Sequence, residues 1–400
     1  MSEIVSRIRY VKLKDYLAGI KFLMALPFSY LLKWKRPHIW LICEDENEAR
    51  DNGYCFFKYL RREHPEIDAV YAINKKSPDF EKVNNLGQII SYGKFTHWIY
   101  YLAAEYNISS QKGGKPNAAI CYFLEIYGFW KNKRIFLQHG IIKDDAKWLY
   151  YDVTKMRCFI CGAKPEYEYV KSVFGYPDGY VRYTGLARYD YLHENIVVSG
   201  RILIMPTWRE WLQENVVKGY DGNNEVGSDF VDSDYYHNWD GLLKSMKLNE
   251  YVEKYDLEVI FYPHRNMQPY LENFKSNNTR IKIADWKEYD VQNLLKTSQV
   301  LITDYSSVFF DFAYMKKPVI FYQFDEEIYR KYQYQQGWFS YGNNSIGRKV
   351  KTKDEVMDAL YELIEKKFQN NDDAIYGHER IFPLYDMNNC KRIYDVVREI

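Results

Sequence analysis

The chain of 400 residues is 47% hydrophobic, so it can build packed cores and is not a disordered protein. It has 21 glycines, 12 prolines and 27% charged residues, which excludes collagen-like and low-complexity chains. Its net charge of +1 gives no general attraction to nucleic acid, so we expect no nucleic-acid partner.

The N-terminal segment, residues 1–37, is strongly basic. It carries a net charge of +6, which leaves −5 for the remainder of the chain. The apolar stretch Leu17–Leu32 is 16 residues long and contains Lys21 and Pro27, so it is shorter than the roughly 20 residues that a spanning helix needs. Apolar side chains at 13, 17, 20, 23 and 24, flanked by cations, predict a helix that lies in the interface of an anionic membrane. A helix packed on the protein's own core remains the alternative. The eight basic residues of the segment are Arg7, Arg9, Lys12, Lys14, Lys21, Lys33, Lys35 and Arg36.

A first series of short apolar runs, separated by helical patterns such as 51–63 and 96–105, predicts parallel βαβ units. The last run contains Cys158 and Cys161, which point to opposite faces of a strand and are expected to be core residues rather than metal ligands. The six cysteines of the chain are too sparse for a disulfide framework, which favours a reducing compartment. The predicted strands are Ile39–Cys43, Ala69–Ile73, Gln88–Ser91, Asn107–Ser109, Arg134–Leu137 and Cys158–Cys161.

A second series follows a polar stretch at 189–200, which is typical of an interdomain linker. The sequence therefore predicts two doubly wound α/β domains, at 38–192 and 193–375. Residues 376–400 are expected to form a terminal helix that packs back on the N-terminal domain. The acidic segment Asp221–Asp240 is expected to be a solvated loop. The strands of the second series are Ile202–Met205, Glu258–Tyr262, Arg280–Ile283, Val300–Thr303 and Val319–Tyr322.

Polar groups that can bind phosphate or move protons follow four of the predicted strands. In open α/β sheets ligands bind beyond the carboxyl ends of the strands, so these groups mark the expected site. Each also has a structural alternative: His139 can be a core histidine, Arg209 can pair with Glu210, and Asp304 or Ser306 can cap the following helix. The four strand-end segments are Gln138-His139-Gly140, Pro206-Thr207-Trp208-Arg209, Pro263-His264-Arg265-Asn266 and Asp304-Tyr305-Ser306-Ser307.

Several motifs, in this order along the chain, resemble the CDP-glycerol glycerophosphotransferase family of teichoic acid and capsule enzymes. The resemblance implies a GT-B architecture, in which two Rossmann-like domains face a central cleft. It also implies a CDP-polyol donor in the C-terminal domain, an undecaprenyl-linked acceptor on the N-terminal side, and peripheral attachment to the cytoplasmic face of the membrane. The motifs are Ala49–Gly53, Gln138–Gly140, Thr184–Asp190, Met205–Arg209, Tyr262–Arg265, Thr303–Asp311 and Lys317–Tyr322.

Transfer of a polyol phosphate needs a base near the attacking hydroxyl and donors around the phosphates. With the donor in the C-terminal domain, His139 is the expected base, and His264 is the second catalytic histidine. Gly140, Arg188 and Asp311 are expected to support the site. We expect neither a metal nor another cofactor, because Arg, His and helix dipoles can balance the phosphate charge. The residues expected to bind the donor phosphates are Thr207, Arg209, Arg265, Asp304, Ser306 and Ser307.

Other functions remain open at this stage. A GT-B glycosyltransferase that uses a nucleotide sugar shares the architecture, and a CDP-ribitol enzyme shares the chemistry. A scaffold protein without catalytic activity is a third possibility. A dinucleotide-binding dehydrogenase and a P-loop NTPase are disfavoured, because neither G-x-G-x-x-G nor Walker A occurs in the sequence.

Overall fold

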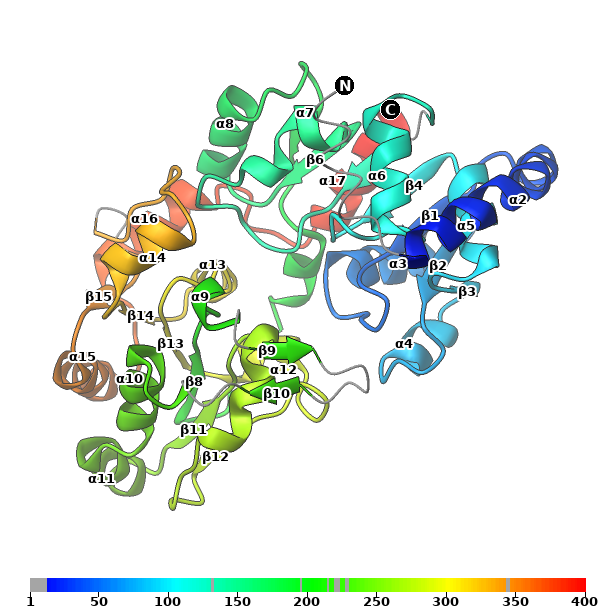
Figure 1. Cartoon of the computed structure of the whole chain (residues 1–400). Coiled ribbons are helices and arrows are strands. Elements are labelled where there is room, and N and C mark those ends of the chain that lie inside the picture. The colour runs from blue at the N-terminus through cyan, green and yellow to red at the C-terminus, as the bar shows by residue number, and fades with distance from the viewer. Residues whose placement is uncertain are drawn as a thin grey trace. The chain divides into compact units, whose positions relative to one another are not determined.

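Two α/β units make up the chain in the computed structural model, which describes residues 13–130, 133–194, 196–213, 216–218, 224–226, 230–342 and 346–400. Unit 1 comprises residues 1–139, 147–191 and 386–400, and unit 2 comprises residues 140–146 and 192–385. The chain therefore contributes the short segment 140–146 to unit 2 before it returns to unit 1. Each unit is described by itself below (Figure 1).

The described part of unit 1 contains a parallel seven-stranded sheet of order β3-β2-β1-β4-β5-β6-β7. Strand β1, third in this order, pairs Trp40 with Ala69 of β2 and with Tyr106 of β4. The strands are fully or largely buried apolar runs, as expected for a sheet that helices cover on both faces. The bounds are β1 Trp40–Cys43, β2 Ala69–Ile73, β3 Ile89–Ser91, β4 Tyr106–Ser109, β5 Lys133–Phe136, β6 Cys158–Cys161 and β7 Val181–Tyr183.

Alternate residues of β1 enter different cores because successive side chains of a strand point to opposite faces. Trp40 and Ile42 lie in the core formed with α3 and α17, whereas Leu41 and Cys43 lie in the core formed with α2 and α5. The helical segments of unit 1 are α2 Leu13–Lys35, α3 Asn52–Glu63, α4 Phe80–Asn84, α5 Phe95–Ala103, α6 Ala118–Ile126, η1 Lys147–Leu149, α7 Tyr151–Thr154, α8 Lys164–Val173, η2 Ala187–Tyr191 and α17 Asn389–Glu399.

Helix α2 has one buried face and one exposed apolar face, so it packs on the core of unit 1 as the alternative expected, and its attachment to a membrane stays a prediction. Ala18 and Ala25 are buried against the core that includes Trp98 of α5, and in Figure 1 the two helices run side by side. The predicted membrane-facing positions Leu17, Ile20, Leu23 and Met24 are each more than half exposed. The helix continues through Pro27. The predicted cations Arg7, Arg9 and Lys12, and the side chain of Lys14, lie outside the described residues.

Unit 2 contains, among its described residues, a six-stranded parallel sheet of order β12-β11-β8-β13-β14-β15 and a separate β9–β10 hairpin. Its strands are β8 Arg201–Met205, β9 Val216–Lys218, β10 Asn224–Val226, β11 Glu258–Phe261, β12 Ile281–Ile283, β13 Val300–Thr303, β14 Val319–Tyr322 and β15 Arg348–Val350. Its helical segments are α9 Glu210–Gln213, α10 Asp234–Leu243, α11 Met246–Lys254, η4 Arg265–Asn273, α12 Val291–Thr297, α13 Phe309–Tyr314, α14 Glu326–Tyr332, α15 Lys353–Glu365 and α16 Asp372–Ile381.

The eleven predicted strands are all present, with ends that differ by at most one residue from the predicted bounds. Strands β7, β9, β10 and β15, each three residues long, were not predicted. The prediction of an acidic loop at Asp221–Asp240 was wrong at Asn224–Val226, which form β10, and from Asp234 onward, where α10 begins with Ser233 as its N-cap. Residues 221–223 and 227–229 of that segment lie outside the described residues.

Both Cys158 and Cys161 are buried in β6, as expected for core residues. The described residues contain no group of three metal-ligating side chains that could hold an ion.

Candidate active site

The first cluster of polar groups lies at the carboxyl ends of β1 and β5 in unit 1. Three residues after the end of β5, His139 places Nδ1 2.7 Å from Oδ2 of Asp51, the residue that caps α3. The other carboxylate oxygen of Asp51 accepts a hydrogen bond from Nη1 of Arg188 at 2.7 Å. One carboxylate thus holds both a histidine and an arginine.

The His139 ring is accessible although its partners are buried. Its side chain is 64% exposed, compared with 11% for Asp51 and 5% for Arg188. With Asp51 ionised, the ring proton of neutral His139 lies on Nδ1 and leaves Nε2 able to accept a proton. A histidine held in this way can act as a general base toward a bound hydroxyl.

The charges around the pair shift both pKa values. Partial desolvation lowers the pKa of His139, but the Asp51 carboxylate more than offsets this effect, so the pKa is raised above its usual 6.5. Burial raises the pKa of Asp51, but His139 and Arg188 outweigh it, so the pKa of that carboxyl is lowered. The pair therefore favours a carboxylate at Asp51, and the imidazolium of His139 is stabilised when it forms.

Hydrogen bonds of the Asn52 side chain connect the start of α3 with the backbone of Gln138, after β5, and of Arg188. Nδ2 of Asn52 donates to the carbonyl of Gln138 at 2.7 Å, and Oδ1 of Asn52 accepts from the backbone N–H of Arg188 at 3.0 Å. Gln138 has a φ of 64°, a left-handed conformation that is unusual for a residue other than glycine. Gly140, which follows His139, is not among the residues with positive φ.

Glu44 lies behind this network and was not identified from the sequence. It directly follows β1, is 1% exposed, and accepts backbone N–H groups of Arg50, Asp51 and Tyr54. Burial raises its pKa well above the usual value, and the Asp51 charge raises it further. A Cβ on Gly53 would come within 2.9 Å of Cγ of Glu44, so the Asp-Asn-Gly turn fits closely over this carboxyl group.

The second cluster lies at the carboxyl ends of β8 and β13 in unit 2, where two of the predicted phosphate ligands have internal partners. Arg209 is fully buried, with Nη2 2.8 Å from Oδ2 of Asp304 and Nε 2.7 Å from Oδ2 of Asp325. Asp304 also accepts the backbone N–H of Thr207 at 2.8 Å. Neither Arg209 nor Asp304 presents a free group to a phosphate in this structure, because each is occupied by internal partners.

The remaining residues of unit 2 stay closer to the surface. His264 is half-buried, and its Nδ1 accepts the backbone N–H of Asn266 at 3.1 Å. The proton of the neutral ring is therefore on Nε2, which makes that atom a donor. Arg265 is exposed and stacks over the ring of Trp286 at 4.9 Å.

The helix that follows β13 is not capped by the residues that we considered as its N-cap. Helix α13 begins at Phe309 with Val308 as its N-cap, so neither Asp304 nor Ser306 caps it. Ser306 and Ser307 are half-buried, and Asp311 is buried in the helix. Among the described residues, the hydroxyl of Thr207 is buried without a hydrogen-bond partner.

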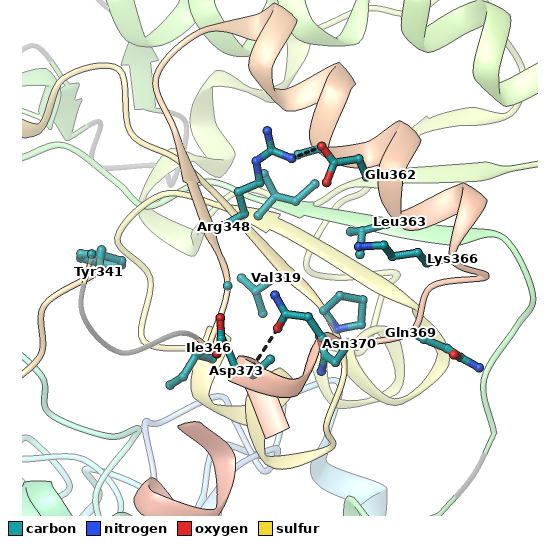
Figure 2. Close-up of a pocket in the computed structure, with 17 residues that line it drawn as sticks. Val319, Tyr341, Ile346, Arg348, Glu362, Leu363, Lys366, Gln369, Asn370 and Asp373 are labelled. Carbon is teal, nitrogen blue, oxygen red and sulfur yellow. Dashed lines mark hydrogen bonds and ion pairs between the residues drawn. The ribbon is translucent and has the colours of Figure 1, made fainter. Parts of the chain in front are cut away.

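A cavity of about 330 Å³ lies elsewhere in unit 2, between α15, β14 and β15 (Figure 2). Its lining includes Val319 and Arg348, which begin β14 and β15, and Arg348 pairs with Glu362. All strands of this sheet are parallel, so the cavity lies at their amino ends. Thr207, His264 and Asp304 follow the carboxyl ends, so this cavity is not the site that they form.

Two Rossmann-like units, each with polar groups after its parallel strands, define a protein of the GT-B type. The chain belongs to the CDP-glycerol:poly(glycerophosphate) glycerophosphotransferase family, whose model matches residues 24–399. This finding agrees with the family resemblance of the motifs.

Comparisons with individual proteins support this family assignment. The minor teichoic acid biosynthesis protein GgaB of Bacillus subtilis (strain 168) is 30% identical over 376 residues, which cover 92% of this chain and 40% of GgaB. The chain therefore corresponds to less than half of that relative's length. The teichoic acid poly(glycerol phosphate) polymerase of Bacillus spizizenii (strain ATCC 23059 / NRRL B-14472 / W23) is 22% identical, with 81% of this chain and 83% of the polymerase covered. The structure of the wall teichoic acid polymerase TagF matches with a TM-score of 0.66 at 16% identity, covering 100% of this chain and 97% of that one, which supports the fold.

Proposed function

We propose that the protein transfers a polyol phosphate, most simply glycerol phosphate from CDP-glycerol, to a hydroxyl of a lipid-linked acceptor in teichoic acid or capsule synthesis. Family membership supports the reaction type. The observation that carries the assignment is the exposed His139 ring, held by the buried Asp51 carboxylate at the end of a central strand. A scaffold protein has no need for such an arrangement.

In this proposal His139 is the general base. Its Nε2 removes the proton of the acceptor hydroxyl while the oxygen attacks the β-phosphorus of the donor. A new O–P bond forms, the bond between the two phosphates breaks, and CMP leaves. Asp51 orients the ring and stabilises the imidazolium, and Arg188 keeps Asp51 ionised.

Unit 2 supplies the donor-binding groups. The Nε2–H of His264 and the guanidinium of Arg265 are the donors to the phosphates, and His264 also stabilises the charge on departing CMP. The hydroxyls of Thr207, Ser306 and Ser307 complete the set. We reassign Arg209 and Asp304 from ligands to positioning residues, because they join the ends of β8 and β13.

Product mass spectrometry tests the assignment. The full chain is incubated with CDP-glycerol, CDP-ribitol or a UDP-sugar together with a short lipid-linked acceptor. We expect a mass increase of one or more glycerol phosphate units and release of CMP. Addition of a sugar with release of UDP would instead establish the glycosyltransferase alternative. A mass increase of ribitol phosphate would support the same type of reaction with CDP-ribitol as the donor.

We also propose that the outer face of α2 attaches the protein to the cytoplasmic face of the membrane as a peripheral protein. Asp15–Lys35 is long and apolar enough to cross a membrane by length and composition. However, Ala18, Ala25 and Ser29 are buried in unit 1, so one face of the helix is already occupied by protein. Apolar residues on the other face, with Lys33 and Lys35 at its end, fit an anionic lipid interface.

A matched pair of variants tests this attachment. Replacing Leu17, Leu23 and Trp34, which are 54%, 63% and 79% exposed, with serine should abolish binding to vesicles that contain anionic lipid. Met246→Ser is the control, because Met246 is 89% exposed but lies in unit 2. Turnover of a soluble acceptor should be unchanged in both proteins. Unaltered vesicle binding by the triple variant would show that another surface makes the attachment.

A further inference from the structure

The Nδ1 atom of His139 has two polar neighbours that make different demands on it. Oδ2 of Asp51 lies 2.7 Å from Nδ1, and Nε2 of the Gln111 side-chain amide lies 2.9 Å from it. An ionised carboxylate only accepts hydrogen bonds, whereas an amide NH2 group only donates them. Because Nδ1 carries either a proton or a lone pair, it cannot donate to Asp51 and accept from Gln111 at the same time.

The loop that follows β4 holds the backbone of Gln111 in place beside the base. The hydroxyl of Ser109 donates to the carbonyl of Gln111 at 2.9 Å and accepts its backbone N–H at 3.0 Å. The backbone N–H of Gly114 donates to the same carbonyl at 3.2 Å. A Cβ on Gly114 would come within 2.0 Å of Oγ of Ser109, so the loop closes tightly over this hydroxyl. Both backbone groups of Gln111 are therefore held by hydrogen bonds.

The charge of Asp51 decides which end of the Gln111 amide can face the ring. Nη1 of Arg188 donates to Asp51 at 2.7 Å, and the pKa of this carboxyl group is lowered, so Asp51 is ionised and Nδ1 carries the proton. The oxygen and nitrogen of a side-chain amide exchange places by rotation about one bond, and the hydrogen-bond partners decide between the two orientations. A protonated Nδ1 attracts the amide oxygen and repels the NH2 group.

We propose that Gln111 is a positioning residue for the base, with its amide turned so that Oε1 faces Nδ1 of His139. Gln111 and Asp51 then share the Nδ1 proton, and Nε2 of the ring is free to take the proton of the acceptor hydroxyl. The inference rests on the proposed function and adds a residue that selects the tautomer of its base. In the opposite orientation Gln111 donates to Nδ1, the ring proton moves to Nε2, and the neutral ring cannot act as the base.

Three variants of the full chain distinguish the two orientations. Gln111→Glu keeps an oxygen acceptor and, when ionised, has no group that donates. Gln111→Met keeps the length of the side chain and removes both polar groups. Gln88→Met is the matched control, because Gln88 also lies in unit 1 and its amide contacts Arg36 and Tyr100.

We expect Gln111→Met to lower kcat by roughly twofold to tenfold, the range for one ordinary hydrogen bond, with KM for CDP-glycerol unchanged. Gln111→Glu should keep kcat at high pH and move the acidic limb of kcat/KM to higher pH, because a second carboxylate stabilises the imidazolium. Gln88→Met should change neither quantity. A kcat of Gln111→Met that is unchanged or raised would overturn the inference, since a donating Gln111 would hold the base in its inactive tautomer.

The nitrogen chemical shifts of the His139 ring provide a readout that does not require turnover. In protein labelled with ¹⁵N-histidine, the signals of His139 are identified by their loss in His139→Gln. Above the pH of the acidic limb, we expect the proton on Nδ1 in the unmodified protein and in Gln111→Glu. Gln111→Met should show a larger fraction of the tautomer protonated on Nε2.

Two NMR results would overturn the inference: a proton on Nε2 of the neutral ring in the unmodified protein, or an unchanged tautomer fraction in Gln111→Met. Absence of polyol phosphate transfer by the unmodified protein would instead count against the proposed function. In that case the tautomer of His139 would still decide which end of the Gln111 amide faces the ring.

Discussion

Both units place a carboxylate beside a cation at the end of a parallel strand region, yet the two pairs differ in exposure. In unit 1, Asp51 holds His139, whose ring is 64% exposed. In unit 2, Asp304 holds Arg209, and both side chains have 0% exposure. The first pair can exchange a proton with a substrate, whereas the second can only hold its own elements together. We call Asp51–His139 the chemical pair and Asp304–Arg209 the architectural pair. Their side-chain exposure, and not their residue type, distinguishes them.

The partners of each pair explain this difference. Asp51 uses one oxygen for His139 and the other for Arg188, so Nε2 of the histidine remains available. Arg209 lies between two carboxylates, and its guanidinium carbon lies 5.1 Å from the centre of the Tyr305 ring. An arginine enclosed on all sides in this way stabilises the fold and has no donor left for a ligand.

The largest effect should follow from breaking the architectural pair. Arg209→Ala leaves Asp304 and Asp325 as buried charges without their partner, so we expect a loss of about 3–5 kcal/mol in the free energy of unfolding. Chemical denaturation measures it, and Arg265→Ala is the matched control because Arg265 is exposed. An Arg209→Ala protein with unchanged stability and weakened CDP binding would return Arg209 to the donor site.

Breaking the chemical pair should affect turnover and its pH dependence instead. Asp51→Asn removes the charge that orients His139, so kcat should fall by about tenfold to a hundredfold, part of the usual contribution of a general base. The base must be neutral, and Asp51 raises its pKa above 6.5, so activity should be lost as pH falls through that raised value. Without Asp51 the acidic limb should move to lower pH. If the acidic limb of kcat/KM against pH does not move in Asp51→Asn, Asp51 does not control the pKa of the base.

A smaller effect is expected at Glu44, which sharpens the account of unit 1. Glu44→Gln keeps one acceptor oxygen, which can still accept the N–H groups of Asp51 and Tyr54, and loses the acceptor of the Arg50 N–H. It should therefore destabilise the protein less than Glu44→Ala. Glu44→Ala should destabilise unit 1 by about 1–3 kcal/mol, because the N–H groups of Arg50, Asp51 and Tyr54 lose their acceptor. Equal thermal stability of the two variants would contradict this role.

The sequence predicted the sheet strands well because each is an apolar run bounded by polar residues, and parallel sheets bury both faces of such runs. It also placed His139, His264 and Asp304 at strand ends. It did not show that Asp51 contacts His139, because 88 residues separate them along the chain. The signal available was Asp-Asn-Gly at the start of a helix, where N-capping explains Asp51 equally well.

The sequence also could not distinguish the roles of its arginines. Arg209 and Arg265 follow neighbouring strands and have the same chemistry, so both were predicted to bind phosphate. Only the fold brings Asp325, which lies 116 residues further along the chain, against Arg209. Burial by distant segments decided which arginine is internal and which is exposed.

The most direct test of the central claim compares His139→Ala and His264→Ala in one pair of measurements: kcat with CDP-glycerol, and CDP binding by calorimetry. We expect His139→Ala to lower kcat by at least about 10²-fold while CDP affinity is unchanged. His264→Ala should weaken CDP binding by about 1.5–3 kcal/mol, the value of a hydrogen bond to a charged group. Near-normal turnover of His139→Ala, or unaltered CDP affinity of His264→Ala, would contradict the division of chemistry and donor binding between the two units.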